Sequence, residues 1–155
     1  IFIDLRKAFD TVDHNILIYK LKHYGIRNIA NDLLASYLVN RQQYVSINGF
    51  KSANERIKIG VPQGSVLGPL LFLIYINDLH QSIKHSTVHH FADDTNVLSI
   101  NQCPKVLTKE LNFDLKNLNN WLKANKISLN VTKTVCSPGH IRRVITLAHL
   151  HTHLP

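Results

Sequence analysis

The chain has 155 residues, 45% of them hydrophobic and 18% charged, which excludes an intrinsically disordered protein and fits one globular domain. Its formal net charge of +8 favours a polyanionic partner such as nucleic acid, while a basic protein without such a partner is the alternative. The most apolar run, residues 66–76, is too short for a membrane span of about 20 residues, so no membrane partner is expected.

The first part of the chain predicts one strand and two helices. Residues 1–5 form a short apolar run that is typical of a buried strand. Asp13 can cap a helix that reaches about Tyr24, and Gly25 follows as its left-handed stop. A second helix is indicated by five apolar residues at helical spacing: Ile29, Leu33, Leu34, Tyr37 and Leu38.

A hairpin comes next. The Asn-Gly pair at residues 48–49 is a strong turn signal, and it follows a strand predicted at residues 44–47. Residues 56–59 alternate between polar and apolar, which predicts the returning strand. The loop at residues 60–65 then leads into a helix that ends near Leu79.

The second half predicts another hairpin and a long helix. Residues 88–92 and 95–100 are strand candidates, joined by a tight turn at residues 93–94. A helix is expected over residues 104–124, and a last short strand over residues 127–131. The helix has one apolar stripe, formed by Leu107, Leu111, Leu115, Leu118 and Leu122.

The end of the chain differs in character from the rest. The alternating His149, His151 and His153 suggest a metal-binding strand face, but no second cluster of ligands is placed to complete such a site. A non-native extension explains the change of composition more simply. The two cysteines are far apart in the sequence, which predicts no disulfide framework and fits a reducing, intracellular compartment, the nucleus or the cytoplasm.

Three of the ten acidic residues occupy unusual places. Asp4 follows an apolar strand segment, and Asp93 and Asp94 lie at the apex of the second hairpin. Strands disfavour Asp, and a buried carboxylate needs a partner or a metal, so a cation site forms if these elements lie side by side. Carboxylates select Mg²⁺, and two such ions can activate an attacking oxygen and stabilise a leaving one. In the alternative, Asp93 and Asp94 form an ordinary Asx-type turn and Asp4 caps the end of a strand. The occurrence of all three acids in a basic chain favours phosphoryl transfer on nucleic acid instead.

Four segments, in this order, resemble the motifs of reverse transcriptases. They are FIDLRKAFD at residues 2–10, GVPQGSVLGP at residues 60–69, FADD at residues 91–94, and the stretch from NNWL at residues 119–122 to Lys133 and Thr134. The residues in these motifs are similar to those of non-LTR, LINE-like retrotransposons, in particular the jockey and CR1 elements of that group. The resemblance covers about residues 1–134.

The resemblance implies roles in the chemistry for five residues. Asp4 and Asp93 would bind two Mg²⁺ ions, with Mn²⁺ as an alternative, and Asp94 would support the site. The backbone carbonyl of Leu5 would be a further metal ligand. Lys133 would protonate the departing pyrophosphate, whereas the alternative makes it an ordinary surface lysine.

The resemblance also implies a nucleotide pocket. Ala8 and Phe9 would line it, and the Phe9 ring would collide with a ribose 2′-hydroxyl, the group that separates RNA from DNA precursors. Gln63 and Gly64 would contact the incoming nucleotide and the template, where the small glycine lets backbone approach closely. In the alternative, Phe9 belongs to the core and Gln63 and Gly64 form a turn before a helix.

The implied fold is α+β: a polymerase palm whose antiparallel sheet packs on helices, with part of the fingers and no thumb. Residues 1–134 would be the palm core, without the start of the fingers, and residues 135–155 a divergent tail. The implied function is RNA-templated DNA synthesis, in which dNTPs extend a DNA primer on an RNA template as part of a retrotransposon. The alternative is a catalytically inactive remnant that binds nucleic acid non-specifically. The chain alone is expected to polymerise poorly or not at all, and no oligomeric state is predicted.

Overall fold

The computed structural model describes residues 1–137, and its contacts divide this part of the chain into two compact units. The first unit is Ile1–Ala8 together with the chain from Ile76 on, and the second is Phe9–Tyr75. The predicted α+β class is confirmed, because helices alternate with antiparallel strand pairs. None of the helices in residues 1–137 is long and apolar enough to cross a membrane. The alternating His149, His151 and His153 lie outside the described residues, and the domain boundary after residue 134 stays a prediction.

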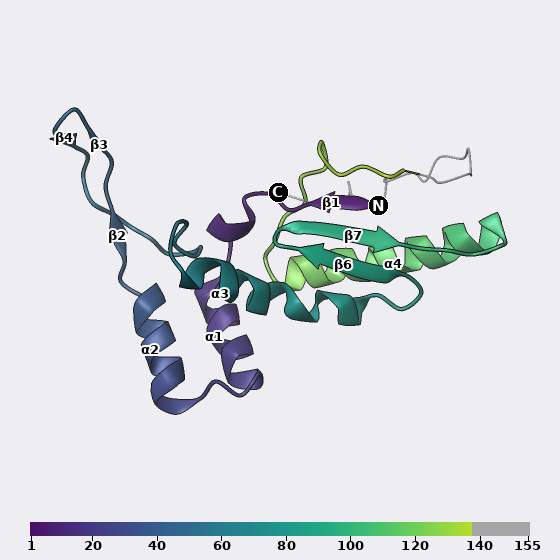
Figure 1. Cartoon of the computed structure of the whole chain (residues 1–155), viewed down its shortest axis with the longest axis horizontal. Helices are drawn as coiled ribbons and strands as arrows, with labels where there is room; N and C mark the ends of the chain where they lie inside the picture. The colour runs from purple at the N-terminus through teal and green to yellow at the C-terminus, as the bar shows by residue number, and fades with distance from the viewer. Residues whose placement is uncertain (138–155) are drawn as a thin grey trace. The chain divides into compact units, whose positions relative to one another are not determined.

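The first unit is built on a three-stranded antiparallel sheet in the order β1-β7-β6 (Figure 1). Its strands are β1 (Phe2–Asp4), β6 (Thr87–Phe91) and β7 (Asp94–Leu98), which confirms the three strands expected there.

The turn between β6 and β7 differs from the prediction by one residue. Phe91 pairs with Asp94, so the two-residue turn consists of Ala92 and Asp93, while Asp94 begins β7. Ala92 adopts a φ of 52°. This left-handed backbone conformation is required in tight hairpin turns and is rare for residues other than glycine.

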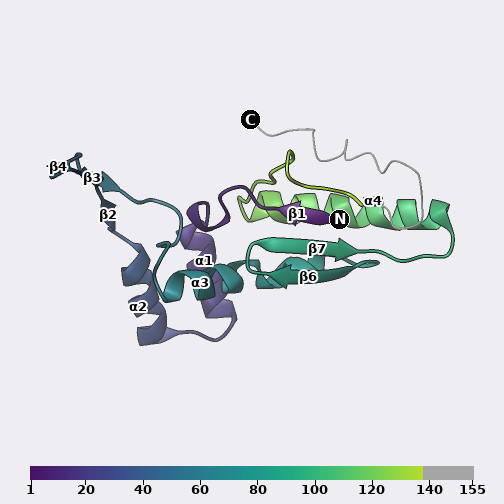
Figure 2. The ribbon, with the colours of Figure 1, turned by 45° about the horizontal axis from the view of Figure 1, so that its top comes forward.

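One face of this sheet is buried. Ile3, Thr95 and Val97 are buried, because side chains of a strand alternate between the two faces. Helix α4 (Pro104–Ala124) runs beside the sheet in Figures 1 and 2. Four of the five leucines of the expected stripe are buried, and Leu107 is half-buried; the buried ones are Leu111, Leu115, Leu118 and Leu122.

Helix α4 also holds the segment that leads into β6. The 3-10 helix η2 (Asn77–Ser82) precedes that segment. The fully buried carboxylate of Asp114 accepts hydrogen bonds from the backbone N–H groups of Lys84 (2.9 Å) and His85 (3.0 Å). A buried carboxylate that is bonded in this way fixes the start of β6 relative to α4.

The strand predicted at residues 127–131 is wrong. Only Leu129 forms a β-bridge there, opposite Leu5, and a second bridge joins Val135 to Phe2. Between the bridges the Asn130 carbonyl accepts the N–H groups of Lys133 and Thr134, which closes a turn and interrupts strand pairing. The segment nevertheless flanks β1 on the edge that β7 does not cover.

The second unit contains the helices α1 (His14–His23) and α2 (Asn28–Leu38). The predicted cap is confirmed, since Asp13 Oδ1 accepts the N–H groups of Asn15 (3.0 Å) and Ile16 (3.1 Å). The predicted stop is also confirmed, because Gly25 follows α1 with a φ of 93°.

The apolar stripe of α2 is largely exposed. Ile29 and Leu33 are 85% and 67% exposed, and only Asn31 and Leu38 are buried on this helix. The Asn31 amide donates a hydrogen bond to the carbonyl of Ile18, which ties α2 to α1. Helical spacing thus predicted the helix correctly but not the burial of its apolar face.

The hairpin of the second unit pairs differently from the prediction. Strand β3 (Ser46–Ile47) pairs with β4 (Phe50–Lys51), and β2 (Gln42–Gln43) pairs with β5 (Glu55–Arg56). The expected returning strand at residues 56–59 is therefore wrong. Both turn residues have a positive φ, as a two-residue hairpin turn requires, so pairing begins directly after the turn.

Helix α3 (Leu67–Ile76) ends the second unit and continues directly into η2, so the helix predicted to end near Leu79 is confirmed. Its residues Leu71, Phe72 and Tyr75 are buried. The Lys20 ammonium donates a hydrogen bond to the carbonyl of Tyr75 (2.6 Å), which joins α1 to α3.

Candidate active site

Asp4 and Asp94 lie on neighbouring strands at the same level of the sheet. The antiparallel register pairs Asp4 of β1 with Asp94 of β7, one step after the buried pair of Ile3 and Thr95. Because side chains alternate along a strand, both carboxylates project from the face opposite to the buried one. Directly opposed side chains in an antiparallel pair have Cβ atoms about 5 Å apart.

Asp93 lies beside this pair, in the turn. It follows Ala92, whose left-handed backbone makes the tight turn, and it directly precedes Asp94. Asp4 and Asp93 are partly exposed, and Asp94 is exposed. The structure therefore brings the three predicted acidic residues to one end of one sheet.

The three carboxylates have no protein partner in the described part of the chain. Among residues 1–137, neither a hydrogen bond nor an ion pair is formed by the side chains of Asp4, Asp93 and Asp94. An Asx-type turn requires a side-chain hydrogen bond to nearby backbone, and so does a strand-end cap. The structural alternative for these residues therefore lacks the hydrogen bonds on which it depends.

The ligand chemistry of this end of the sheet fits a divalent cation. Carboxylate oxygens are the hard ligands that Mg²⁺ and Mn²⁺ prefer. Within residues 1–137, however, no group of three or more His, Cys, Asp or Glu side chains is arranged so that it could hold a metal ion. The metal-binding roles of the three aspartates stay a prediction, supported by ligand type and by the register.

Lys133 lies in a turn that is bound to β1 next to Asp4. The Asn130 N–H donates to the carbonyl oxygen of Asp4 (2.9 Å), and the Asp4 N–H donates to the Thr134 hydroxyl (3.4 Å). Thr134 Oγ1 in turn donates to the Asn130 carbonyl (2.9 Å). Lys133 itself is exposed, so its backbone is held beside β1 while its side chain is open to solvent.

Leu5 and Ala8 are both buried, at 4% exposure each. Leu5 continues β1 and forms the bridge to Leu129, and the next residue, Arg6, donates its N–H to the Ser128 carbonyl. Ala8 begins the 3-10 helix η1 (Ala8–Asp10). Their predicted contacts with metal and nucleotide stay predictions.

Phe9 belongs to the second unit and packs against another aromatic ring. Its ring centroid lies 4.6 Å from that of Phe72, with an angle of 35° between the ring planes. Phe72 is fully buried, whereas Phe9 is half-buried. The Phe9 ring thus contributes to the core, and its partly exposed surface leaves room for a second role.

Gln63 is held by a residue to which the sequence analysis assigned no role. Gln63 Nε2 donates a hydrogen bond to Asp10 Oδ1 (2.7 Å), which links two of the four motifs within the second unit. The adjacent Gly64 has a φ of 80°, and a Cβ atom added there would meet nothing within 4 Å. Glycine is therefore favoured there by its backbone conformation, beside open space.

The same loop makes two close backbone approaches. A Cβ atom on Gly60 would lie 2.8 Å from the carbonyl oxygen of Asp10, and one on Gly68 would lie 2.5 Å from that of Pro62. Both glycines are thus required by packing.

Three further residues were missed by the sequence analysis. Asp10 was quoted within a motif without a role, and Thr134 was quoted only as the end of one. Phe91 pairs with Asp94 and is 82% exposed, so it extends the row formed by Asp4 and Asp94 across the sheet. The one signal in the sequence that could have identified all three is their position inside the motifs.

Comparison with known proteins identifies the class. The profile of the family described as reverse transcriptase (RNA-dependent DNA polymerase) matches residues 1–142, so the chain belongs to this family. The resemblance noted in the sequence is thereby confirmed.

The relatives agree with this assignment. The chain is 32% identical over 139 residues to the RNA-directed DNA polymerase from mobile element jockey of Drosophila melanogaster, covering 85% of this chain and 15% of that protein. It is 33% identical over 148 residues to the probable RNA-directed DNA polymerase from transposon BS of the same species, covering 87% of this chain and 16% of that protein. A polyprotein from the type-1 retrotransposable element R2 of Popillia japonica is 29% identical over 153 residues, covering 88% of this chain and 22% of that protein. The chain thus spans about a sixth of the length of the first two relatives.

Proposed function

We propose that this chain carries the catalytic carboxylates of an RNA-templated DNA synthesis reaction. In that reaction the 3′-hydroxyl of a DNA primer attacks the α-phosphate of a dNTP, and pyrophosphate leaves. The observation that carries the proposal is the meeting of Asp4, Asp93 and Asp94 at one end of a sheet, where their side chains have no partner among residues 1–137. Membership of the reverse transcriptase family and relatives named as RNA-directed DNA polymerases support it.

Asp4 and Asp93 would hold the divalent ions of the reaction, and Asp94 would add negative charge beside them. Two Mg²⁺ ions would supply charge neutralisation for the attacking and leaving oxygens. Oxygen ligands with no protein partner suit this task, since they need not break an existing bond to bind a cation.

The other residues would bind, orient and move a proton. Lys133 would donate a proton to the pyrophosphate oxygen, from a turn whose backbone is bonded to Asp4. Gln63, oriented by Asp10, would bind the incoming nucleotide next to the open space at Gly64. Phe9 would exclude a 2′-hydroxyl by overlap. RNA template, DNA primer and dNTPs are the partners that this proposal requires.

Single-nucleotide incorporation tests the proposal. The purified chain is incubated with an RNA template, a labelled DNA primer, one dNTP and Mg²⁺. We expect slow incorporation, because the chain spans only about a sixth of the length of its relatives. Contacts that position the primer and the nucleotide contribute several kcal/mol in such reactions. Asp93→Asn should remove the incorporation, whereas Asp32→Asn, an exposed acid on α2, should leave it unchanged.

Two results would overturn the proposal. One is incorporation that survives in Asp93→Asn, which would place the chemistry elsewhere. The other is a wild-type chain that folds and incorporates nothing, which favours the alternative of a catalytically inactive remnant that binds nucleic acid.

A further inference from the structure

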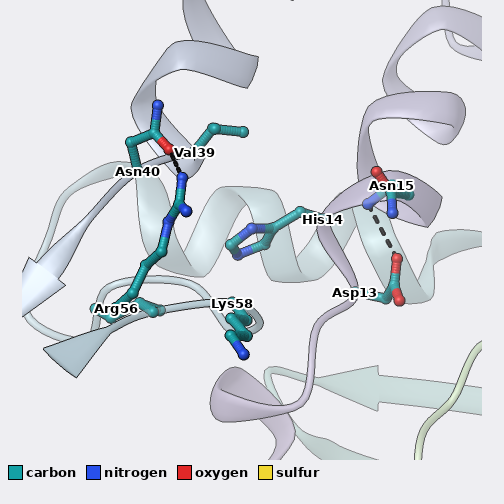
Figure 3. Close-up of a pocket in the computed structure, with 8 residues that line it drawn as sticks. Asp13, His14, Asn15, Val39, Asn40, Arg56 and Lys58 are labelled. Carbon is teal, nitrogen blue, oxygen red and sulfur yellow. Dashed lines mark hydrogen bonds between the residues drawn. The ribbon is translucent and has the colours of Figure 1, made fainter.

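A pocket of about 350 Å³ lies in the second unit, between the start of α1, the end of α2 and residues 56–58 at the end of β5. His14, Asn15, Asn40, Arg56 and Lys58 are among the residues that line it. Figure 3 shows the His14 ring pointing into the space towards Arg56 and Lys58. We propose that this pocket binds a phosphate of single-stranded nucleic acid through Arg56 and Lys58.

The basic side chains of the pocket are available for an anion. The Arg56 guanidinium donates one hydrogen bond to Asn40 Oδ1, which orients it and leaves its other N–H groups for a phosphate. Lys58 is exposed and forms no ion pair within residues 1–137. Two cationic side chains that line one pocket suit a phosphate group in charge, and the planar guanidinium suits it in donor geometry.

The one carboxylate of the pocket does not cancel this charge at the ligand. Asp13 is buried, and its Oδ1 accepts the N–H groups of Asn15 and Ile16 at the start of α1. The two cationic side chains, Arg56 and Lys58, outnumber this single acid. His14 Nε2 is hydrogen-bonded to the Gly60 carbonyl at 2.7 Å, which fixes the orientation of the imidazole that lines the pocket.

The hairpin next to the pocket points to a nucleic acid as the source of the phosphate. Residues 41–58 contain four basic side chains, Arg41, Lys51, Arg56 and Lys58, and one acid, Glu55, so their net charge is 4 − 1 = +3. Figures 1 and 2 show β3 and β4 projecting beyond α2.

Exposed aromatic rings lie between these charges. Tyr44 is 50% and Phe50 82% exposed, and the Lys51 ammonium lies 5.1 Å from the centroid of the Tyr44 ring. Basic groups that alternate with exposed aromatic rings are the usual surface for a single strand, whose phosphates bind the cations while its bases stack. A single nucleic-acid strand whose phosphate lies in the pocket therefore has a surface along the hairpin on which to continue.

The proposal does not rest on the proposed catalysis, and its test uses neither metal nor dNTP. Binding of a fluorescein-labelled twelve-residue oligothymidylate to the full chain is measured by anisotropy in EDTA, across a range of salt concentrations. Arg56→Gln/Lys58→Gln is compared with Lys105→Gln/Lys109→Gln, which removes the same charge from two exposed lysines of α4.

The pocket variant should lose two phosphate contacts. Each contact contributes about 0.7 to the slope of log affinity against log salt, so the slope should fall by about 1.4 and the affinity at 0.1 M salt about 25-fold. The α4 variant should keep the wild-type slope. Equal losses in both double variants, or no loss in the pocket variant, would overturn the proposal.

A second variant guards against misfolding, since Arg56→Gln also removes the bond to Asn40. Asn15→Asp adds a carboxylate to the pocket at the first turn of α1, where a negative charge stabilises the helix. It should weaken binding several-fold without lowering the melting temperature, whereas Asn120→Asp on α4 should have little effect. Unchanged binding by Asn15→Asp would contradict a phosphate in this pocket. Loss of nucleotide incorporation in Asp93→Asn has no bearing on this result, so the two proposals fail separately.

Discussion

Asp4 of β1 lies directly opposite Asp94 of β7, so two like charges face each other on the open side of the sheet. Like charges in directly opposed positions destabilise an antiparallel pair, by about 0.2 to 1 kcal/mol. The pair therefore lowers the stability of the chain unless a cation lies between the carboxylates.

Asp94→Asn should raise the free energy of unfolding in EDTA by about 0.5 kcal/mol, because it removes this repulsion. Added Mg²⁺ should stabilise the wild-type chain more than the variant. Urea unfolding with and without Mg²⁺ measures both effects. Asp32→Asn on α2 is the control, and a wild-type chain that Mg²⁺ stabilises no more than the variant contradicts the expectation.

Phe9 is expected to have two separable roles. Phe9→Val should lower the free energy of unfolding by about 2 kcal/mol, because it removes the ring that packs on Phe72. It should also raise the ratio of ribonucleotide to deoxyribonucleotide incorporation about tenfold, because the pocket would admit a 2′-hydroxyl. Urea unfolding and single-nucleotide incorporation give the two quantities.

Phe72→Leu separates these roles. It removes the same ring contact but leaves the Phe9 ring in the chain, so it should lower stability without changing the incorporation ratio. If Phe9→Val also leaves the ratio unchanged, Phe9 is a core residue alone.

Asp10 is expected to act through Gln63. Asp10→Ala removes the acceptor of the Gln63 amide, so KM for the dNTP should rise several-fold while kcat changes less. Asp10→Asn keeps an acceptor oxygen and should restore most of the wild-type KM. Steady-state incorporation kinetics of the three chains test this, and a Gln63 that acts independently would leave KM unchanged in Asp10→Ala.

His90 should make stability depend on pH. Burial lowers the pKa of His90, and the neighbouring His80 and His89 lower it further. Nδ1 of His90 lies 3.0 Å from the Thr95 hydroxyl, while its buried Nε2 has no hydrogen-bond partner in the described part of the chain. His90 therefore binds a proton more readily in the unfolded chain than in the folded one. Its contribution to the free energy of unfolding is fully present above about pH 6.5 and is lost as the pH falls below that value.

His90→Gln keeps a polar group for Thr95 but cannot be protonated. Its free energy of unfolding should fall less than that of the wild-type chain between pH 7.5 and pH 5.5. His23→Gln, which changes an exposed histidine of α1, should behave like the wild type. Parallel pH profiles for the wild type and His90→Gln would show that His90 does not carry the effect.

The elements with local signals were predicted well from the sequence. Asp13 caps α1 as expected because a cap depends on neighbours within three residues. Helix α4 follows from its leucine spacing alone. The meeting of Asp4 with the hairpin of Asp93 was expected from the unusual strand placement of the acids, and the register of β1 and β7 is the arrangement that expectation requires.

The parts that were not predicted depend on contacts between distant residues or on turn geometry. Gln63 bonds to Asp10 across 53 residues, and no local pattern marks such a pair. The alternation at residues 56–59 suggested a strand, but the tight turn at residues 48–49 makes pairing begin at Phe50. The spacing in α2 predicts an apolar stripe, yet nothing in that spacing indicates which surface would cover Ile29.

Mn²⁺ binding tests the central claim most directly, namely that Asp4, Asp93 and Asp94 together hold a divalent cation. Mn²⁺ is added in small amounts to the full chain, and paramagnetic broadening of the backbone amide signals is recorded by NMR. The account predicts that the signals of these three residues broaden first, that Asp4→Asn and Asp93→Asn abolish this, and that Asp32→Asn does not. Broadening that is absent from this end of the sheet, or that persists in both variants, would contradict the account.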